Sequence, residues 1–369
     1  MKYKLIGNKY KVSRVGIGGH YSKMEEGSYE DRFADVTSYE IEMRTKMIQK
    51  AVESGINYFD TTWQNEVCML SKVIQSLNLR DDIFVNGMVL GAFAGSQNTG
   101  MDVCDYFNKW LDKRLKVMPQ NHFDSFMINA IEECYDESKC EKLVRLLEKR
   151  RQNGDFKIFG FSSHNSILAR KVADTFKDFE IIMVPYNYKN RSFETAFSSY
   201  QGNASFVAMK PLIWAEYGIP FNSLNSLPNP EKILNIKPVD DVASIAVNWV
   251  ASKNSITTTV CAVNNQSELD ELITAGASDL LERNEPILKS YENAMQQQDN
   301  IPFFISALYG DDRNRRKRFF ALTNLAKSLN IPLPDIPLNT DKSDEILSRL
   351  MEGLLVEVTK QGYGSFLKK

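Results

Sequence analysis

Short apolar runs alternate with helical patterns over most of the chain, and this alternation constrains the fold more than any other feature. Eight runs have the length and the aromatic and β-branched content of buried strands. They lie at residues 14–19, 56–61, 82–89, 123–129, 156–162, 180–187, 206–210 and 256–263. Strands that alternate with helices indicate a parallel sheet. Eight nearly even units favour closure into a (β/α)8 TIM barrel over a doubly wound open sheet, within the α/β class.

The segment at residues 38–55, SYEIEMRTKMIQKAVESG, is the clearest of the intervening helices. Ser38 can cap its first turn, because serine oxygen accepts a backbone N–H that has no partner in the helix. Met47 and Ile48 fall on one face, and Gly55 can end the helix and turn the chain into the next strand. This pattern predicts an amphipathic helix that packs on the sheet.

Two segments fall outside the repeat. Residues 213–238 contain four prolines and no sustained period, which predicts a long loop after the seventh strand, over the carboxyl end of the barrel. After about residue 300 the alternation ends, and two helical patterns follow. We therefore predict a barrel domain at residues 1–299 and a C-terminal helical extension at 300–369. The basic run at 313–318 is read as a solvated helix end and not as a nucleic-acid patch.

Composition limits the partners of the chain. Its 369 residues include 45 basic and 47 acidic side chains, so a formal charge of −2 provides no general attraction to nucleic acid or anionic membrane. The N-terminus lacks the apolar core of a signal peptide, which predicts a cytoplasmic protein. Five cysteines without a C-x-x-C pair suggest reduced thiols, and three histidines in all argue against a His-rich metal site. We expect a small-molecule substrate, no nucleic acid and no membrane, with the C-terminal helices available for a protein partner or self-association.

Four motifs occur in the order GINYFDT, KIFGFSSHN, VPYNY and VAMKPL. From about residue 4 to residue 282 the chain resembles the aldo-keto reductase superfamily, and IPFFISALYG beyond it is similar to the branch with a ferredoxin-like C-terminal tail. The resemblance implies a (β/α)8 barrel that reduces carbonyl groups with NADPH. It also implies four catalytic residues: a tyrosine acid, a histidine, a lysine that lowers the tyrosine pKa, and an aspartate paired with that lysine.

Of these four residues only the aspartate has a counterpart here. Asp60 holds its position at the end of the second strand, but the loop TTWQNE is shorter than usual and offers Trp63 and Gln64 where the tyrosine is expected. The lysine position falls on Met88 and the histidine position on Asn129. The family branch binds an iron–sulfur cluster through cysteines that have no counterpart after Cys261, so we expect no cluster.

A lone carboxylate at a barrel mouth requires a new cation or a new role. Lys210, at the end of the seventh strand, is predicted to form an ion pair with Asp60, and Tyr186 or Tyr21 would then donate the proton. A lone aspartate is also compatible with a structural role, and His20 with packing in a turn. The candidate catalytic residues are Asp60, His20, Tyr21, Lys210, Tyr186 and Asn129.

The resemblance also implies a nicotinamide cofactor, either NADP or NAD. Met183 replaces the glutamine that binds the nicotinamide amide in the family, and Ala262 replaces a glycine beyond the eighth strand. No arginine marks a 2′-phosphate there. The candidate cofactor-binding residues are Ser162, Ser163, His164, Asn187, Asn264, Asn265 and Ser267.

Three functional hypotheses remain open at this point. The first is a divergent NAD(P)-dependent oxidoreductase that acts on a small carbonyl or related metabolite with a non-standard proton donor. The second is a non-redox lyase, isomerase or dehydratase that uses the same pocket, since chemistry resides in strand-end residues and not in the fold. The third is a catalytically inactive pseudoenzyme or binding subunit that docks through the C-terminal helices.

Overall fold

The computed structural model describes residues 1–18, 38–212, 237–279 and 284–296. By its internal contacts the chain divides into one unit of Met1–Pro211 with Ala246–Leu280 and another of Leu212–Ile245 with Leu281–Lys369. His20, Tyr21, most of the predicted 213–238 loop and the predicted extension at 300–369 lie outside the described residues. The domain boundary at residue 299 therefore stays a prediction.

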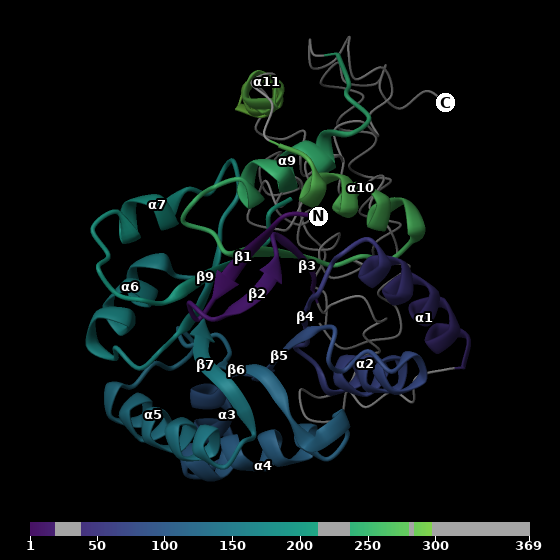
Figure 1. Cartoon of the computed structure of the whole chain (residues 1–369). Coiled ribbons are helices and arrows are strands. Elements are labelled where there is room, and N and C mark those ends of the chain that lie inside the picture. Colours follow the sequence, from purple (N-terminus) through teal and green to yellow (C-terminus); the bar gives the residue numbers. More distant parts are fainter. Residues whose placement is uncertain (19–37, 213–236, 280–283, 297–369) are drawn as a thin grey trace, which may run out of the picture. The chain divides into compact units, whose positions relative to one another are not determined.

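Eight parallel strands close into a barrel, which confirms the predicted TIM-barrel fold (Figure 1). Around the barrel the strands run in the order β10-β3-β4-β5-β6-β7-β8-β9. Their bounds are β3 Val15–Ile17, β4 Tyr58–Asp60, β5 Phe84–Val89, β6 Phe123–Ile128, β7 Phe156–Ser162, β8 Ile181–Pro185, β9 Ser205–Met209 and β10 Thr258–Cys261. Pairing of β10 with both β9 and β3 closes the sheet. Each predicted strand therefore pairs with the strands that precede and follow it in the sequence, and the last pairs with the first.

Helices connect the strands and surround the barrel (Figure 1). Their bounds are α1 Ser38–Glu53, α2 Gln64–Leu77, α3 Ala92–Thr99, α4 Val103–Leu115, α5 Glu137–Gln152, α6 Ser166–Thr175, α7 Ser192–Phe197, α9 Val242–Ala251 and α10 Gln266–Ala277, with a 3-10 turn η1 at Pro119–Asn121. Helix α11, Asn284–Gln296, belongs to the other unit. Within the described ranges, no helix is both long and apolar enough to cross a bilayer.

Helix α1 forms as its sequence predicts. Met47 and Ile48 are buried against the barrel, as their helical spacing requires. Gly55 has a φ of +88°, a left-handed conformation that costs glycine little, and its N–H donates to the Val52 carbonyl at 2.8 Å. The glycine therefore ends the helix and directs the chain into β4.

The chain begins with a hairpin that the sequence analysis did not predict. Strands β1 (Tyr3–Ile6) and β2 (Tyr10–Ser13) pair antiparallel and lie across one opening of the barrel (Figure 1). Ile6 and Val12 belong to the same apolar core as the inward side chains of the barrel strands. The Gly7 N–H donates to Ser205 Oγ at the first residue of β9, at 2.9 Å. Because Ser205 marks the amino end of the barrel, the hairpin closes that end.

Two glycines let the barrel close. A Cβ on Gly16 would lie 2.7 Å from the ring of Tyr58, and one on Gly160 would lie 1.7 Å from the Ile181 carbonyl oxygen. Both distances are far below van der Waals contact. The sequence therefore places a glycine at each point where a neighbouring strand or ring takes the space of a side chain.

A buried ion pair also lies at the amino end of the strands. Arg80 Nη1 contacts Asp124 Oδ2 at 2.9 Å, with the side chains 8% and 2% exposed. Lys157 Nζ lies 2.5 Å from the other oxygen of Asp124. Asp124 is the second residue of β6 and Lys157 the second residue of β7, whereas Asp60 is the last residue of its strand. The pair therefore lies at the opposite end of the barrel from Asp60.

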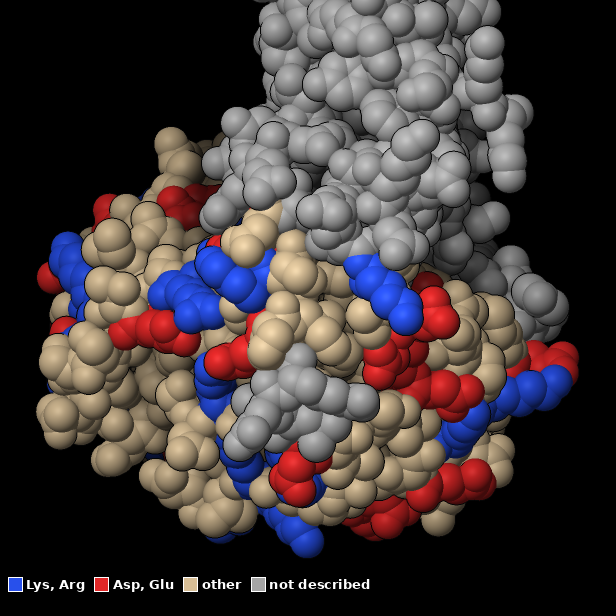
Figure 2. Space-filling view, turned by 90° about the horizontal axis from the view of Figure 1, so that it is seen from above, with Lys and Arg blue, Asp and Glu red and all other residues tan. Residues whose placement is uncertain are grey.

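Acidic and basic side chains are interspersed over the described part of the surface seen in Figure 2. The exposed pair Lys46–Glu42, one turn apart in α1, is typical, with a separation of 2.7 Å. Such exposed pairs contribute little to stability, because water screens both charges. The charged surface therefore favours solubility more than it strengthens the fold.

Candidate active site

Asp60 is the last residue of β4, so its carboxylate lies at the carboxyl end of the barrel, where the active sites of TIM-barrel enzymes are found. Its side chain is 6% exposed, and its Oδ1 accepts a hydrogen bond from Asn86 Nδ2 at 2.7 Å. Asn86 Oδ1 in turn accepts from Ser125 Oγ at 2.6 Å. Residue pairing of Asp60 with Asn86 and of Asn86 with Ser125 in adjacent strands produces this chain of bonds.

The phenol of Tyr58 lies two residues before Asp60 and faces the same barrel interior. Burial raises the pKa of Tyr58 well above its ordinary value, and the negative charge of Asp60 adds to the rise. Tyr58 therefore stays neutral and is a weak acid, although it is a tyrosine close to Asp60.

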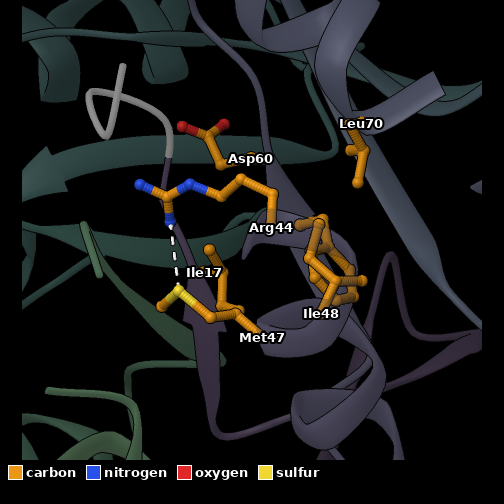
Figure 3. Close-up of a pocket in the computed structure, with 7 residues that line it drawn as sticks. Ile17, Arg44, Met47, Ile48, Asp60 and Leu70 are labelled. Atoms are coloured by element: carbon orange, nitrogen blue, oxygen red, sulfur yellow. Dashed lines mark hydrogen bonds between the residues drawn. The ribbon is translucent and has the colours of Figure 1, made fainter. Parts of the chain in front are cut away.

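Arg44 is a functional candidate that the sequence analysis missed. It lies on α1, is 4% exposed, and lines one small cavity together with Asp60. Figure 3 shows its guanidinium extended toward the side of the cavity on which the Asp60 carboxylate lies. Its Nη1 also donates to the carbonyl of Val263, just beyond β10. The signal was present in the sequence, because Arg44 precedes Met47 by three residues and Ile48 by four and so shares their buried face.

The walls of this cavity are otherwise apolar. They come from both strands and helices: Ile17, Met47, Ile48, Phe59 and Leu70. The cavity measures about 10 Å³, which is near the least space that holds one water molecule. It is therefore too small for a substrate.

The short loop after β4 is held in place from within the protein. Glu66 Oε2 accepts from the backbone N–H groups of Thr62 at 2.7 Å and Trp63 at 2.9 Å. Arg114, on α4, donates to the Thr62 carbonyl at 2.7 Å. Burial lowers the pKa of Arg114 to about 10, while the negative charge of Glu66 opposes that fall, so the guanidinium remains charged at neutral pH. Trp63 is buried and forms part of this packed loop.

A second polar group at the barrel mouth joins Asn129 to Ser162. Asn129 Nδ2 donates to Ser162 Oγ at 3.0 Å and lies 3.2 Å from Met88 Sδ. The buried N–H of Ala130 also donates to Ser162 Oγ at 3.0 Å. Since Ser162 Oγ accepts both bonds, the contacts seen among the described residues leave its own hydrogen and the Asn129 Oδ1 available. Met88 itself lies in the apolar core of the barrel.

Ser163 and His164 begin the loop after β7. Ser163 Oγ accepts from the N–H of Asn165 at 3.1 Å, and His164 Nδ1 lies 2.6 Å from Glu132 Oε1. Burial opposes ionisation of Glu132, but hydrogen bonds from His164, from backbone N–H groups and from Ser163 outweigh it and lower the pKa of Glu132 to about 2. The carboxylate therefore only accepts, which places the shared hydrogen on His164 Nδ1. His164 is 44% exposed, so the pair lies on the rim.

Tyr186 and Asn187 follow β8, and both are buried. The Tyr186 hydroxyl donates to Glu194, and burial together with that bond raises its pKa, which makes it a weaker acid than an exposed phenol. Asn187 Nδ2 donates to the Lys210 carbonyl at 3.0 Å, and its Oδ1 accepts two backbone N–H groups. Lys210 has an exposed side chain and a φ of +58°. Its predicted ion pair with Asp60 stays a prediction.

The remaining cofactor candidates lie at the start of α10. Asn265 Oδ1 caps the helix by accepting the Glu268 N–H at 2.9 Å. The side-chain amides of Asn264 and Asn265 donate to the two oxygens of Glu268, at 3.1 and 2.9 Å. The Glu268 carboxylate thus binds both asparagine amides at the N-terminus of α10. Ser267 is exposed beside it.

The structure therefore brings Asp60 together with Asn86 and Arg44 on one side of the mouth, and Asn129 with Ser162 on another. His20 and Tyr21 cannot be placed, because they fall outside the described residues. In the described part of the chain, no three His, Cys, Asp or Glu side chains gather in a way that could hold a metal ion.

Solved structures of similar fold are aldo-keto reductases. One from Bacillus halodurans, in its holo form, is 16% identical, covers 80% of this chain and 96% of its own, and superposes with a TM-score of 0.57. One from Klebsiella pneumoniae, in complex with NADP and acetate, is 14% identical over 78% and 94% of the two chains, with a TM-score of 0.55. An aldo-keto reductase from Klebsiella pneumoniae in complex with NADPH is 13% identical, covers 79% of this chain and 96% of its own, and has a TM-score of 0.55. At such identities these likenesses establish the fold alone.

The sequence itself gives the family. A search of curated proteins finds no match. The model of the aldo/keto reductase family matches residues 27–285, which is more than half of the chain and spans all the barrel strands from β4 to β10. The barrel topology, the strand-end position of Asp60 and this match agree, and the chain belongs to the aldo/keto reductase family.

Proposed function

We propose that the protein is an NAD(P)-dependent oxidoreductase that acts on a small carbonyl compound or related metabolite. The proposal includes a proton donor other than the tyrosine usual in the family. The observation that carries it is the buried carboxylate of Asp60, held by Asn86 at the end of β4 in a chain that belongs to the aldo/keto reductase family. The Klebsiella relatives, whose structures contain NADP or NADPH, support the cofactor class.

The polar pair at the mouth fits one part of such a cofactor. A carboxamide needs one donor for its oxygen and one acceptor for its N–H₂ group. Ser162 can supply the hydroxyl hydrogen and Asn129 the Oδ1, because their other atoms are held by bonds to each other and to Ala130. When bound, NAD(P)H supplies the hydride, and these two residues would orient its nicotinamide ring over the barrel.

A titration tests the proposal. Purified full-length protein is titrated with NADPH and with NADH, while tryptophan fluorescence and the thermal unfolding temperature are followed. We expect saturable binding below about 1 mM. Ser162→Ala should weaken it about tenfold, the equivalent of one hydrogen bond. Ser138→Ala, an exposed serine at the start of α5, is the matched control and should bind as the wild type does. Absence of any effect at millimolar concentrations of both cofactors would refute the proposal.

A specific observation favours a second candidate function. Met88 and Met183 are buried and cannot bind an amide or a phosphate, and the amides of Asn187, Asn264 and Asn265 are already bonded to other groups of the chain. These features would suit a non-redox lyase, isomerase or dehydratase that uses Asp60 in acid–base chemistry. Stabilisation by a metabolite in the absence of cofactor would support it. Stabilisation only by a partner protein would instead support a pseudoenzyme or binding subunit.

A further inference from the structure

We propose that His164 and Glu132 form an acid–base pair at the carboxyl end of the barrel, in which Glu132 holds Nδ1 and His164 Nε2 exchanges a proton with the substrate. His164 is then the catalytic residue, and Glu132 is the positioning residue that acts through it. For the reaction this rests on the proposed function, because it names the proton donor which that function requires. Sequence reasoning placed His164 among the cofactor-binding residues and did not single out Glu132.

The pair is formed by two loops that follow neighbouring strands. Glu132 lies on the loop after β6 and His164 on the loop after β7, and these two strands pair side by side in the barrel. The N–H of Ile131 donates to the Ser162 carbonyl at 3.0 Å and so joins the two loops beside the pair. The distance of 2.6 Å between His164 Nδ1 and Glu132 Oε1 is therefore supported by the backbone on both sides.

The loop that carries Glu132 holds two residues in an uncommon backbone conformation. Ala130 has a φ of +49° and Cys134 a φ of +60°, left-handed values that residues other than glycine rarely adopt. The N–H of Ala130 donates to Ser162 Oγ at 3.0 Å, which helps to hold this conformation. Backbone strain of this kind concentrates at functional sites, and here it occurs on both sides of the carboxylate.

His164 is not needed to cap the helix that follows it. Asn165 caps α6, because its Oδ1 accepts the N–H groups of Ile167 and Leu168, each at 3.0 Å. Among the described residues, the ring of His164 forms its hydrogen bond with Glu132. Since that bond uses Nδ1 and the side chain is 44% exposed, Nε2 is the nitrogen left for a substrate.

Glu132 sets the position of the ring hydrogen. Burial opposes its ionisation, but hydrogen bonds, that of His164 foremost, lower the pKa of Glu132 to about 2. An ionised carboxylate only accepts, so a neutral His164 ring keeps its hydrogen on Nδ1 and its lone pair on Nε2. The same carboxylate stabilises the imidazolium once Nε2 is protonated. Lys171, on α6, pairs instead with Glu137 at 3.3 Å.

Other acidic hydrogens at this end of the barrel are held more tightly. Burial raises the pKa of Tyr58 well above its ordinary value, and it also raises that of Tyr186, which donates to Glu194. Burial raises the pKa of the Cys261 thiol to about 12. Histidine, by contrast, is the residue type that exchanges protons near neutral pH. The pair with Glu132 is therefore the better suited of these groups to general acid–base work.

In carbonyl reduction, the carbonyl carbon receives a hydride from the nicotinamide cofactor of the proposed function, and the oxygen takes the proton from Nε2 of the His164 imidazolium. The Nε2–H bond breaks and an O–H bond forms, while the electron pair of the broken bond stays on Nε2. The ring is left neutral, with its hydrogen on Nδ1 and bonded to Glu132. Because the ring is partly exposed, solvent can return the proton to Nε2.

One experiment measures the pair without cofactor or substrate. Full-length protein is treated with diethyl pyrocarbonate at about pH 8, where imidazoles of ordinary pKa are neutral, and acylation of each histidine is followed by peptide mass spectrometry. Glu132→Gln should slow acylation of His164 about tenfold, the loss of one charge-assisted hydrogen bond. His122, whose Nδ1 lies 2.7 Å from the Gly154 carbonyl oxygen, is the internal standard and should react at an unchanged rate. A His164 rate that differs by less than about twofold between the two proteins overturns the proposal.

The catalytic step is tested with para-nitrobenzaldehyde as the carbonyl probe and the more tightly bound of NADPH and NADH. His164→Ala should lower kcat about a hundredfold or more, with KM for the aldehyde within about threefold of wild type. Added imidazole should then restore the rate in proportion to its concentration, which a histidine with a purely structural role would not allow. His122→Ala is the matched control and should keep the wild-type kcat. A kcat of His164→Ala within about threefold of wild type, or no rescue by imidazole, contradicts the proposal.

The two proposals can fail separately. If neither cofactor binds but Glu132→Gln slows acylation of His164, only the oxidoreductase proposal falls, and the pair stands as the acid–base group of a non-redox enzyme. If cofactor binds and the aldehyde is reduced equally by wild type and His164→Ala, the pair alone is refuted. If cofactor binds and this aldehyde is not reduced, the acylation rates decide.

Discussion

Replacing Asn86 by aspartate tests the hydrogen bond that holds Asp60. Asn86 is fully buried, and its Nδ2 lies 2.7 Å from Asp60 Oδ1. Aspartate has nearly the same shape but puts a second carboxylate in place of the donor. Two carboxylates this close cannot both be ionised, so one of them must hold a proton that then serves in the hydrogen bond.

The size of the effect follows from the pKa change this requires. A like charge together with full burial raises a carboxyl pKa by about 3 units, and each unit corresponds to about 1.4 kcal/mol, so Asn86→Asp should lose about 4 kcal/mol of unfolding free energy at neutral pH. The folded state then holds a proton that the unfolded state releases. The loss is therefore absent below the unfolded pKa, near pH 4, grows as pH rises, and levels off above the raised pKa, near pH 7.

Urea unfolding of wild type and Asn86→Asp between about pH 4 and pH 8 measures this difference, because that range covers the window between the two pKa values and the plateau above it. Asn203→Asp, at an exposed position, is the control for adding one negative charge and should show no such dependence on pH. A stability difference that is the same at both ends of the range, or smaller than about 1 kcal/mol at pH 8, would show that the two side chains are not coupled as the structure indicates.

Three further changes follow from the same structure. Ser162→Ala should lower the unfolding free energy by about 1–3 kcal/mol, because the buried N–H of Ala130 loses its acceptor; chemical denaturation measures it, and a loss below about 0.5 kcal/mol would contradict it. Gly160→Ala should prevent folding, since its Cβ would lie 1.7 Å from the Ile181 oxygen; soluble protein with a wild-type circular dichroism spectrum would contradict this. Tyr186→Phe should leave cofactor binding and any turnover within about twofold of wild type, because its phenol is buried with a raised pKa; a loss of turnover of about a hundredfold or more would instead make Tyr186 the proton donor.

Much of the barrel was predictable because strand and helix periods are local properties of the chain. β7 coincides with its predicted run, and the other barrel strands fall within their runs or differ by one residue at an end. The N-terminal hairpin was missed, since β1 and β2 have only four residues each and alternate weakly. The hairpin covers the amino end of the barrel only because Ile6 and Val12 pack into the barrel core, and that core exists only once the barrel has closed.

The candidate site was likewise predictable only in those features that depend on local sequence. The sequence by itself determined that Asp60 stands at a strand end. The replacement of the family's usual tyrosine, lysine and histidine stays a prediction from the sequence. Only the tertiary structure decided what surrounds Asp60. Asn86 meets it through the register of β4 and β5, and Arg44 lines the same small cavity because α1 packs with its apolar face toward β3 and β4. Periodicity shows which face of an element is buried, but register and helix packing determine which buried side chains meet, and these are fixed only when all eight strands have closed.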